Sequence, residues 1–147
     1  MKELPDKLWQ LLELAINDAQ LCQSDSQFKL DMLEWLEPDC EDTVCRVCMA
    51  GAVMAKTLGC PTDEECYPSR IGGTTEAKLR AINELRLGDV YGAKSWIDRH
   101  RGSSELEAKL EQHMYLLDAV REAQMTPWIN GWKAHKDLAA LLKQMDI

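Results

Sequence analysis

The sequence has no apolar run long enough to span a lipid bilayer. Its most apolar stretch, Val44 to Leu58, is interrupted by Arg46 and Lys56 and falls short of the roughly 20 residues that a transmembrane helix needs. The beginning, MKELPDKLWQ, carries Glu3 and Asp6 and lacks the apolar centre of a secretory signal peptide. We therefore expect a cytoplasmic protein with no membrane partner, in a compartment where cysteine thiols stay reduced.

Positive charge is also scarce. Against 25 Asp and Glu there are only 17 Lys and Arg among 147 residues, which gives a net charge of −8. Because such a chain is repelled by phosphate backbones, we expect no direct binding to nucleic acid through bulk charge. Hydrophobic residues make up 46% of the sequence and charged residues 29%, so a core can form and intrinsic disorder is disfavoured.

The familiar catalytic motifs are missing. The sequence contains no G-x-S-x-G, no H-E-x-x-H and no kinase signature, and neither glycine-rich nucleotide motif occurs. We therefore predict no catalytic residue and no cofactor. The sequence favours a non-enzymatic protein but leaves the question of enzyme activity open.

Five of the six cysteines lie between positions 40 and 66. Cys40, Cys45 and Cys48 give the spacing C-x4-C-x2-C, which plant-type ferredoxins also use. A zinc site would need a second close pair of ligands, and Cys60 and Cys66 are too far apart in sequence to match one. We interpret Cys45 and Cys48 as small apolar residues of a buried helix. The sequence therefore predicts no metal site. The alternatives are a metal or iron–sulfur centre built on these five cysteines, and redox or nucleophilic work by one of them.

Hydrophobic spacing predicts a mainly α protein, with residues 1–147 forming a single helical domain. Residues 27–37 fit either one short strand near 27–31 or a helical turn. Thr43 is expected to cap a central helix and Gly59 to end it. We expect about six helices, over residues 5–22, 44–58, 76–87, 89–100, 104–124 and 127–145.

Tryptophan is frequent for this length, with five residues. We expect Trp35 and Trp96 to lie in the core. Trp9, Trp128 and Trp132 fit either the core or a contact with a partner.

Acidic residues are concentrated in the first half of the chain. Residues 1–66 hold fourteen acids and five bases, whereas residues 67–147 hold eleven acids and twelve bases. Such a group can imitate phosphates and occupy the nucleic-acid-binding site of another protein, or it can be a solvated face that keeps the chain soluble. The residues that we predict to bind a partner are Glu37, Asp39, Glu41, Asp42, Asp63, Glu64 and Glu65.

A glycine pair precedes a basic helix in S-R-I-G-G-T-T-E-A-K-L-R, residues 69–80. Backbone N–H groups at such a turn, together with a helix N-terminus, can hold an anion. Flanking cations would add charge-assisted hydrogen bonds. A plain turn with a threonine cap is the alternative. The predicted ligand-binding residues are Arg70, Gly72, Gly73, Thr74, Lys78 and Arg80.

Three segments carry a resemblance to a known group of proteins. L-D-M-L-E-W (30–35), C-R-V-C-M-A-G-A-V-M-A (45–55) and K-L-R-A-I-N-E-L-R-L-G-D (78–89) resemble small accessory proteins encoded by tailed bacteriophages. The resemblance spans roughly residues 28–97. It implies a phage gene product in the host bacterial cytoplasm and transfers no catalytic residue.

The favoured function is that of a non-enzymatic accessory protein. It would bind and modulate a host or phage protein, as in host takeover or evasion of bacterial defence. One alternative is a protein that binds or sequesters a nucleotide or other phosphorylated molecule through residues 70–80, and a second is a cysteine-rich metal-binding protein. The sequence leaves the partner's identity and the oligomeric state open.

Overall fold

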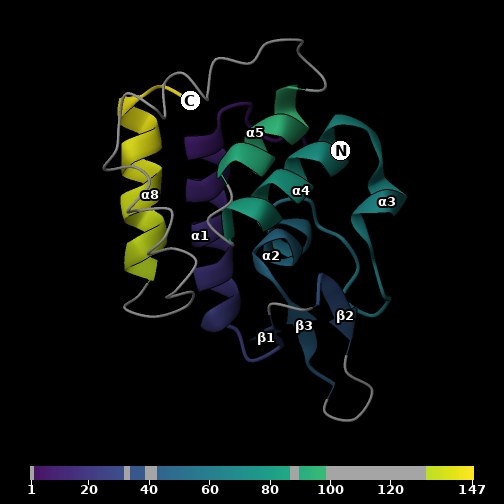
Figure 1. Cartoon of the computed structure of the whole chain (residues 1–147). Helices are drawn as coiled ribbons and strands as arrows, with labels where there is room; N and C mark the ends of the chain where they lie inside the picture. The colour runs from purple at the N-terminus through teal and green to yellow at the C-terminus, as the bar shows by residue number, and fades with distance from the viewer. Residues whose placement is uncertain (1, 32–33, 39–42, 87–89, 99–131) are drawn as a thin grey trace.

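The computed structural model describes residues 2–31, 34–38, 43–86, 90–98 and 132–147 (Figure 1). Within these residues the chain forms six helices and three short strands, so the mainly α class is confirmed but the single expected strand is too few. The helix expected over 104–124 and the first part of the one over 127–145 lie outside the described residues. In chain order the elements are α1 (Leu8–Gln23), β1 (Phe28–Leu30), β2 (Leu36–Pro38), β3 (Cys45–Val47), α2 (Met49–Lys56), α3 (Pro68–Ile71), α4 (Gly73–Arg86), α5 (Val90–Asp98) and α8 (Lys133–Gln144).

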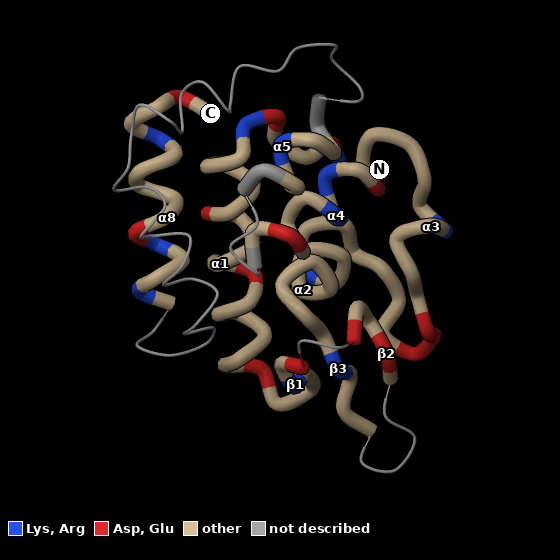
Figure 2. The backbone as a smooth tube through the Cα atoms, viewed as in Figure 1, with Lys and Arg blue, Asp and Glu red and all other residues tan. Residues whose placement is uncertain are grey.

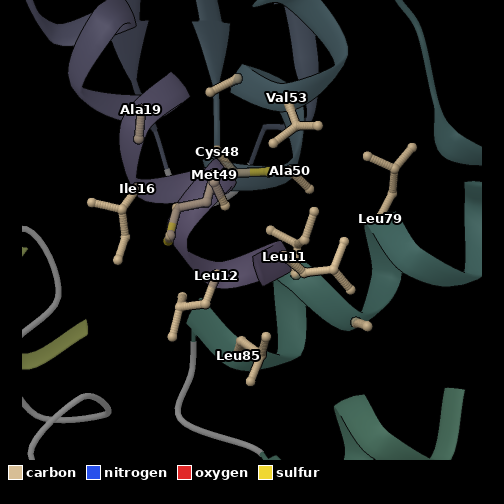
Figure 3. Close-up of a cluster of buried hydrophobic side chains, with 14 of the residues drawn as sticks. Leu11, Leu12, Ile16, Ala19, Cys48, Met49, Ala50, Val53, Leu79 and Leu85 are labelled. Atoms are coloured by element: carbon tan, nitrogen blue, oxygen red, sulfur yellow. The ribbon is translucent and has the colours of Figure 1, made fainter. Parts of the chain in front are cut away.

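Helix α1 is the central helix of the described structure. It contacts α8, α2 and α4, and the sheet lies at one end of the helices (Figure 1). Figure 3 shows its leucines beside apolar side chains of α2 and α4. Burying each leucine contributes about 1.5–3 kcal/mol, so this face accounts for much of the helix's stability. Its buried apolar residues recur three or four positions apart, as the sequence predicts: Leu8, Leu11, Leu12, Ala15, Ile16 and Ala19.

The three strands form a mixed sheet in the order β1-β3-β2. β1 pairs with β3 in parallel and β2 pairs with β3 in antiparallel orientation. In β3, Cys45 and Val47 are buried while Arg46 between them is only partly buried. This alternation lets the strand pack one face against the helices. Pro38 lies within β2, on the edge of the sheet, where its missing N–H costs no ladder hydrogen bond.

The prediction of a helix over 44–58 with Thr43 as its cap is wrong for the first five residues of that range. Residues 45–47 form β3, and α2 begins at Met49 after Cys48. Cys48 has extended backbone angles, and its Sγ accepts a hydrogen bond from the N–H of Gly51 (3.4 Å). The reason is that strands β1 and β2 flank this segment and pair with it from both sides, which a helix would prevent.

The end of α2 follows the expectation more closely. Gly59 has a φ of +66°, the left-handed conformation typical of a residue that ends a helix. The N–H of Cys60 then donates to the carbonyl oxygen of Met54 (2.9 Å). This backbone contact fixes the chain as it leaves the helix.

Gly51 lets the backbone that leads into β2 pack closely against α2. A Cβ atom placed at this position would overlap the carbonyl oxygen of Trp35. Any larger residue at position 51 would push this segment away from α2.

Helices α4 and α5 pack side by side. Leu79, Ile82 and Leu85 of α4 are buried, as the sequence predicts. Ala93 of α5 is buried, and Trp96 is partly buried with its Nε1 donating to Glu84 of α4. The expected core position of Trp96 is therefore confirmed in part.

Helix α8 closes the other side of α1. Trp132, at its N-terminus, is 1% exposed, and its Nε1 donates to Gln23 Oε1 at the end of α1 (2.9 Å). Its ring and the ring of the buried His135 form a T-shaped pair, with the centroids 5.6 Å apart. Trp132 is therefore a core residue. Trp9 is half-buried beneath Lys143, and Trp128 lies outside the described residues.

No helix in the described ranges is both long enough and apolar enough to cross a membrane.

Candidate protein-interaction surface

The fold brings together two acidic segments that are far apart in sequence. Glu34 and Glu37 lie at β2, whereas Asp63–Glu65 lie between α2 and α3. The N–H of Cys66 donates to the carbonyl oxygen of Leu36 in β2 (3.1 Å), so the second segment runs beside the strand that carries Glu37. Figure 2 shows the acidic positions of both segments in the same region. We call Glu34, Glu37 and Asp63–Glu65 the acidic surface.

The predicted partner-binding residues are placed as follows. Asp63, Glu64 and Glu65 are exposed and Glu37 is partly buried. Asp39, Glu41 and Asp42 lie outside the described residues. Glu34, which was not among the predicted partner-binding residues, belongs to the surface because it lies beside Glu37. Its sequence signal was its place among the concentrated acids of the first half of the chain.

Glu34 and Glu37 interact directly. Their side chains share a hydrogen bond, which raises the pKa of Glu37, and partial burial and the negative charge of Glu34 raise it further. The nearby Arg46 opposes this effect by favouring the charged form. A cation brought to this pair by a partner would offset the repulsion between the two carboxyl groups and favour the charged form of Glu37.

Cations of the chain lie at the border of the acidic surface. Arg46 stands opposite Glu37 in the sheet register, and its Nη1 forms an ion pair with Asp31 Oδ2 (3.3 Å). Arg70 Nη1 donates to the backbone carbonyl of Glu65 (2.6 Å). This contact uses the main chain of the acidic segment and leaves the Glu65 carboxylate unoccupied by it.

The predicted anion-binding turn lies at the junction of α3 and α4. Gly72 and Gly73 have φ values of +72° and +61°, so both glycines are needed for the turn. The N–H of Gly72 donates to the carbonyl oxygen of Pro68 (3.1 Å) and is thus used within α3. Thr74 is exposed in the first turn of α4, which begins at Gly73 and not at residue 76 as expected.

The cations predicted to assist this turn have partners within the chain. Lys78 is 4% exposed, and its Nζ donates to the carbonyl oxygen of Leu4 (2.7 Å) and to Asp6 Oδ1 (2.9 Å). Arg80 pairs with Glu76 (3.0 Å) and stacks over the ring of Trp96. Ligand binding by this segment stays a prediction, and its cations serve structural contacts.

The cysteines are distributed over different elements. Cys45 lies on β3, Cys48 precedes α2, and Cys22 is buried in α1. In the part of the chain that the structure describes, no three His, Cys, Asp or Glu side chains are grouped so as to hold a metal ion. Burial raises the pKa of Cys22 to about 12 and that of Cys60 to about 11. Since the thiolate is the nucleophile and the metal ligand, these two thiols are weak in both roles at neutral pH.

A hollow of about 280 Å³ lies between α1 and α8. It borders neither the acidic surface nor the α3–α4 turn. Its lining is mixed in character, with Glu13, Ile16, Asn17 and Gln20 from α1 and Lys136 and Ala139 from α8.

A scan against protein-family models and searches of curated proteins and of solved structures gave no match to the chain. The resemblance to accessory proteins of tailed bacteriophages therefore stays a prediction.

Proposed function

We propose that the protein is a non-enzymatic interaction protein whose acidic surface binds a basic site on another protein and modulates its activity. The observation that carries the proposal is the contact between Cys66 and Leu36, which places exposed acids of residues 63–65 beside Glu37. Acids that are about 27 positions apart in sequence thereby present one negative surface.

The electrostatics of the surface favour a basic partner. Charge complementarity increases association rates and discriminates among partners. The repulsion from Glu34 that raises the pKa of Glu37 marks a place where a cation would be stabilised. Because exposed charges are screened over about 8 Å at physiological ionic strength, such a complex weakens as salt is added. A partner that normally binds nucleic acid would carry the matching positive site. In the phage setting that the resemblance implies, this activity would serve host takeover or evasion of defence.

The test is a comparison of two variants with the same change of charge. Asp63→Asn, Glu64→Gln and Glu65→Gln together neutralise the exposed half of the surface. Glu3→Gln, Glu13→Gln and Asp137→Asn together neutralise three other exposed acids. Tagged wild-type protein is used to recover its partner from a bacterial lysate, and affinities are then measured with the purified partner.

We expect wild-type protein to recover one dominant partner in near-stoichiometric yield and nucleic acid to compete with it. The first variant should bind at least tenfold more weakly, while the second binds like wild type. Equal binding by the first variant and wild type would refute the acidic surface as the site. Recovery of no partner at all would count against the function as a whole.

A further inference from the structure

Two cysteine side chains meet in the segment between α2 and α3. The backbone of Cys60 is fixed to the end of α2 by its hydrogen bond to Met54 (2.9 Å), and that of Cys66 is fixed to β2 by its hydrogen bond to Leu36 (3.1 Å). The Cys66 thiol lies near enough to the Cys60 thiol to raise its pKa. The fold thus holds both ends of residues 61–65 and keeps the two thiols near each other.

The surroundings of this pair differ from those of the other described cysteines. Cys22, Cys45 and Cys48 are buried, whereas Cys60 and Cys66 are only partly buried. Both pack against the edge of the hydrophobic core, and residues 61–65 between them are all exposed. A small reagent can therefore reach these sulfurs without the core having to open.

We propose that Cys60 and Cys66 form a reversible dithiol–disulfide pair that a low-molecular-weight disulfide oxidises. In the first step one protein thiolate attacks a sulfur of the reagent and forms a mixed disulfide with it. The reagent's S–S bond breaks, and its other half leaves as a small thiol after taking up a proton. In the second step the other cysteine's thiolate attacks the protein sulfur of the mixed disulfide, the Cys60–Cys66 bond forms, and the second small thiol leaves. Two protein thiols thus lose two electrons and two protons, and the reagent is reduced to two thiols.

The rate of this reaction should depend on pH. Thiol exchange proceeds through the thiolate, and burial together with the neighbouring Cys66 raises the pKa of Cys60 to about 11. We therefore expect oxidation to be slow at neutral pH and to accelerate as the pH rises. The inference does not depend on the proposed function, because it concerns only the chemistry of the two thiols.

The experiment uses the folded wild-type chain and oxidised glutathione at pH 8. After reaction, free thiols are alkylated, the protein is digested with trypsin, and the peptides are identified by mass spectrometry. One tryptic peptide, residues 57–70, contains both cysteines and no internal Lys or Arg. A second digestion after glutamate cuts it between Cys60 and Cys66, so that only a disulfide keeps the two pieces joined.

We expect this peptide to lose both alkylation sites on oxidation, to stay joined after the second digestion, and to regain both sites on reduction. Cys60→Ser and Cys66→Ser should each stop at the glutathione adduct of the remaining cysteine. If both cysteines remain alkylated, if each carries glutathione, or if either is joined to another cysteine, the proposal is overturned. The decisive measurement is made on the wild-type chain and so does not depend on the folding of either variant.

Discussion

The buried carboxyl group of Asp18 offers a sharp test of the packing between α1 and α2. Asp18 is 3% exposed on the inner face of α1, and it accepts a hydrogen bond from the hydroxyl of Thr57 just after α2. Burial raises its pKa above the ordinary 3.8, although hydrogen bonds from Thr57 and Asn17 oppose this. Removal of the charge by Asp18→Asn keeps the size of the side chain. In this variant the Thr57 hydroxyl can still form a hydrogen bond, either by donating to the oxygen of the side-chain amide or by accepting from its nitrogen.

The sign of the effect follows from the direction of the pKa change. An acid whose pKa is raised in the folded state binds its proton more tightly there than in the unfolded chain. Its contribution to stability is therefore full below pH 3.8 and is lost as the pH rises through the folded-state pKa. We expect Asp18→Asn to be more stable than wild type at pH 7, by on the order of 1 kcal/mol, as is usual for one buried polar site. For a chain of this length that corresponds to a rise in Tm of about 3 °C.

Urea denaturation of both proteins at several pH values between 3.5 and about 8 checks this expectation, provided unfolding stays two-state. The advantage of the variant should grow with pH over this range and become small at its acid end. A variant that is less stable than wild type at pH 7, or a difference that does not change with pH, would refute the assignment of Asp18 as a buried and charge-disfavoured group.

Three further changes have clear expected outcomes. Asp25→Asn should show the opposite pH dependence to Asp18→Asn, because a hydrogen bond from Lys56 lowers the pKa of Asp25. The loss of stability in this variant should be full at pH 7 and should shrink as the pH falls below 3.8. A loss that does not change with pH would contradict the ion pair. Gly51→Ala should lower the free energy of unfolding by about 3 kcal/mol or more, since the new Cβ would overlap the backbone of the segment before β2. A loss below about 1 kcal/mol in urea denaturation would show that α2 and this segment do not pack so closely. Lys78→Met should lower the free energy of unfolding by about 1–3 kcal/mol, because the buried carbonyl of Leu4 would lose its donor. The control Lys136→Met, an exposed change on α8, should change the free energy of unfolding by no more than about 0.5 kcal/mol.

The helices were predictable from the sequence where their periodicity is long. The 16-residue α1 repeats its apolar positions over four turns, and the structure places it within three residues of the expected start. The inward face of α4 was equally clear from Leu79, Ile82 and Leu85. Such patterns are local, so the chain's own neighbours determine them.

The sheet was not predictable in the same way. Each strand has three residues, too few for an alternation to stand out from the apolar run that continues into α2. Strand β3 exists because residues 28–30 and 36–38 pair with it from both sides. That pairing is a property of tertiary structure, and it overrides the helical interpretation of Cys45 and Cys48.

The candidate surface was half predictable. The sequence marks Glu37 and Asp63–Glu65 as acidic, but only the contact between Cys66 and Leu36 shows that they lie side by side. The same holds for Lys78, whose sequence position beside the turn suggested an anion ligand. Its ammonium group points instead to Leu4 and Asp6, which are more than 70 positions away in the chain.

The side chains that give the acidic surface its charge are not the groups that hold its two segments together. Asp63, Glu64 and Glu65 are exposed and add charge, whereas Leu36, which is 1% exposed, and the backbone of Cys66 hold the two segments together. Because exposed side chains contribute little to stability, neutralising the three acids should leave the unfolding midpoint unchanged. A loss of partner binding by that variant would then report on charge alone. This separation allows the proposed function to be tested without disturbing the core formed by α1, α2 and α4.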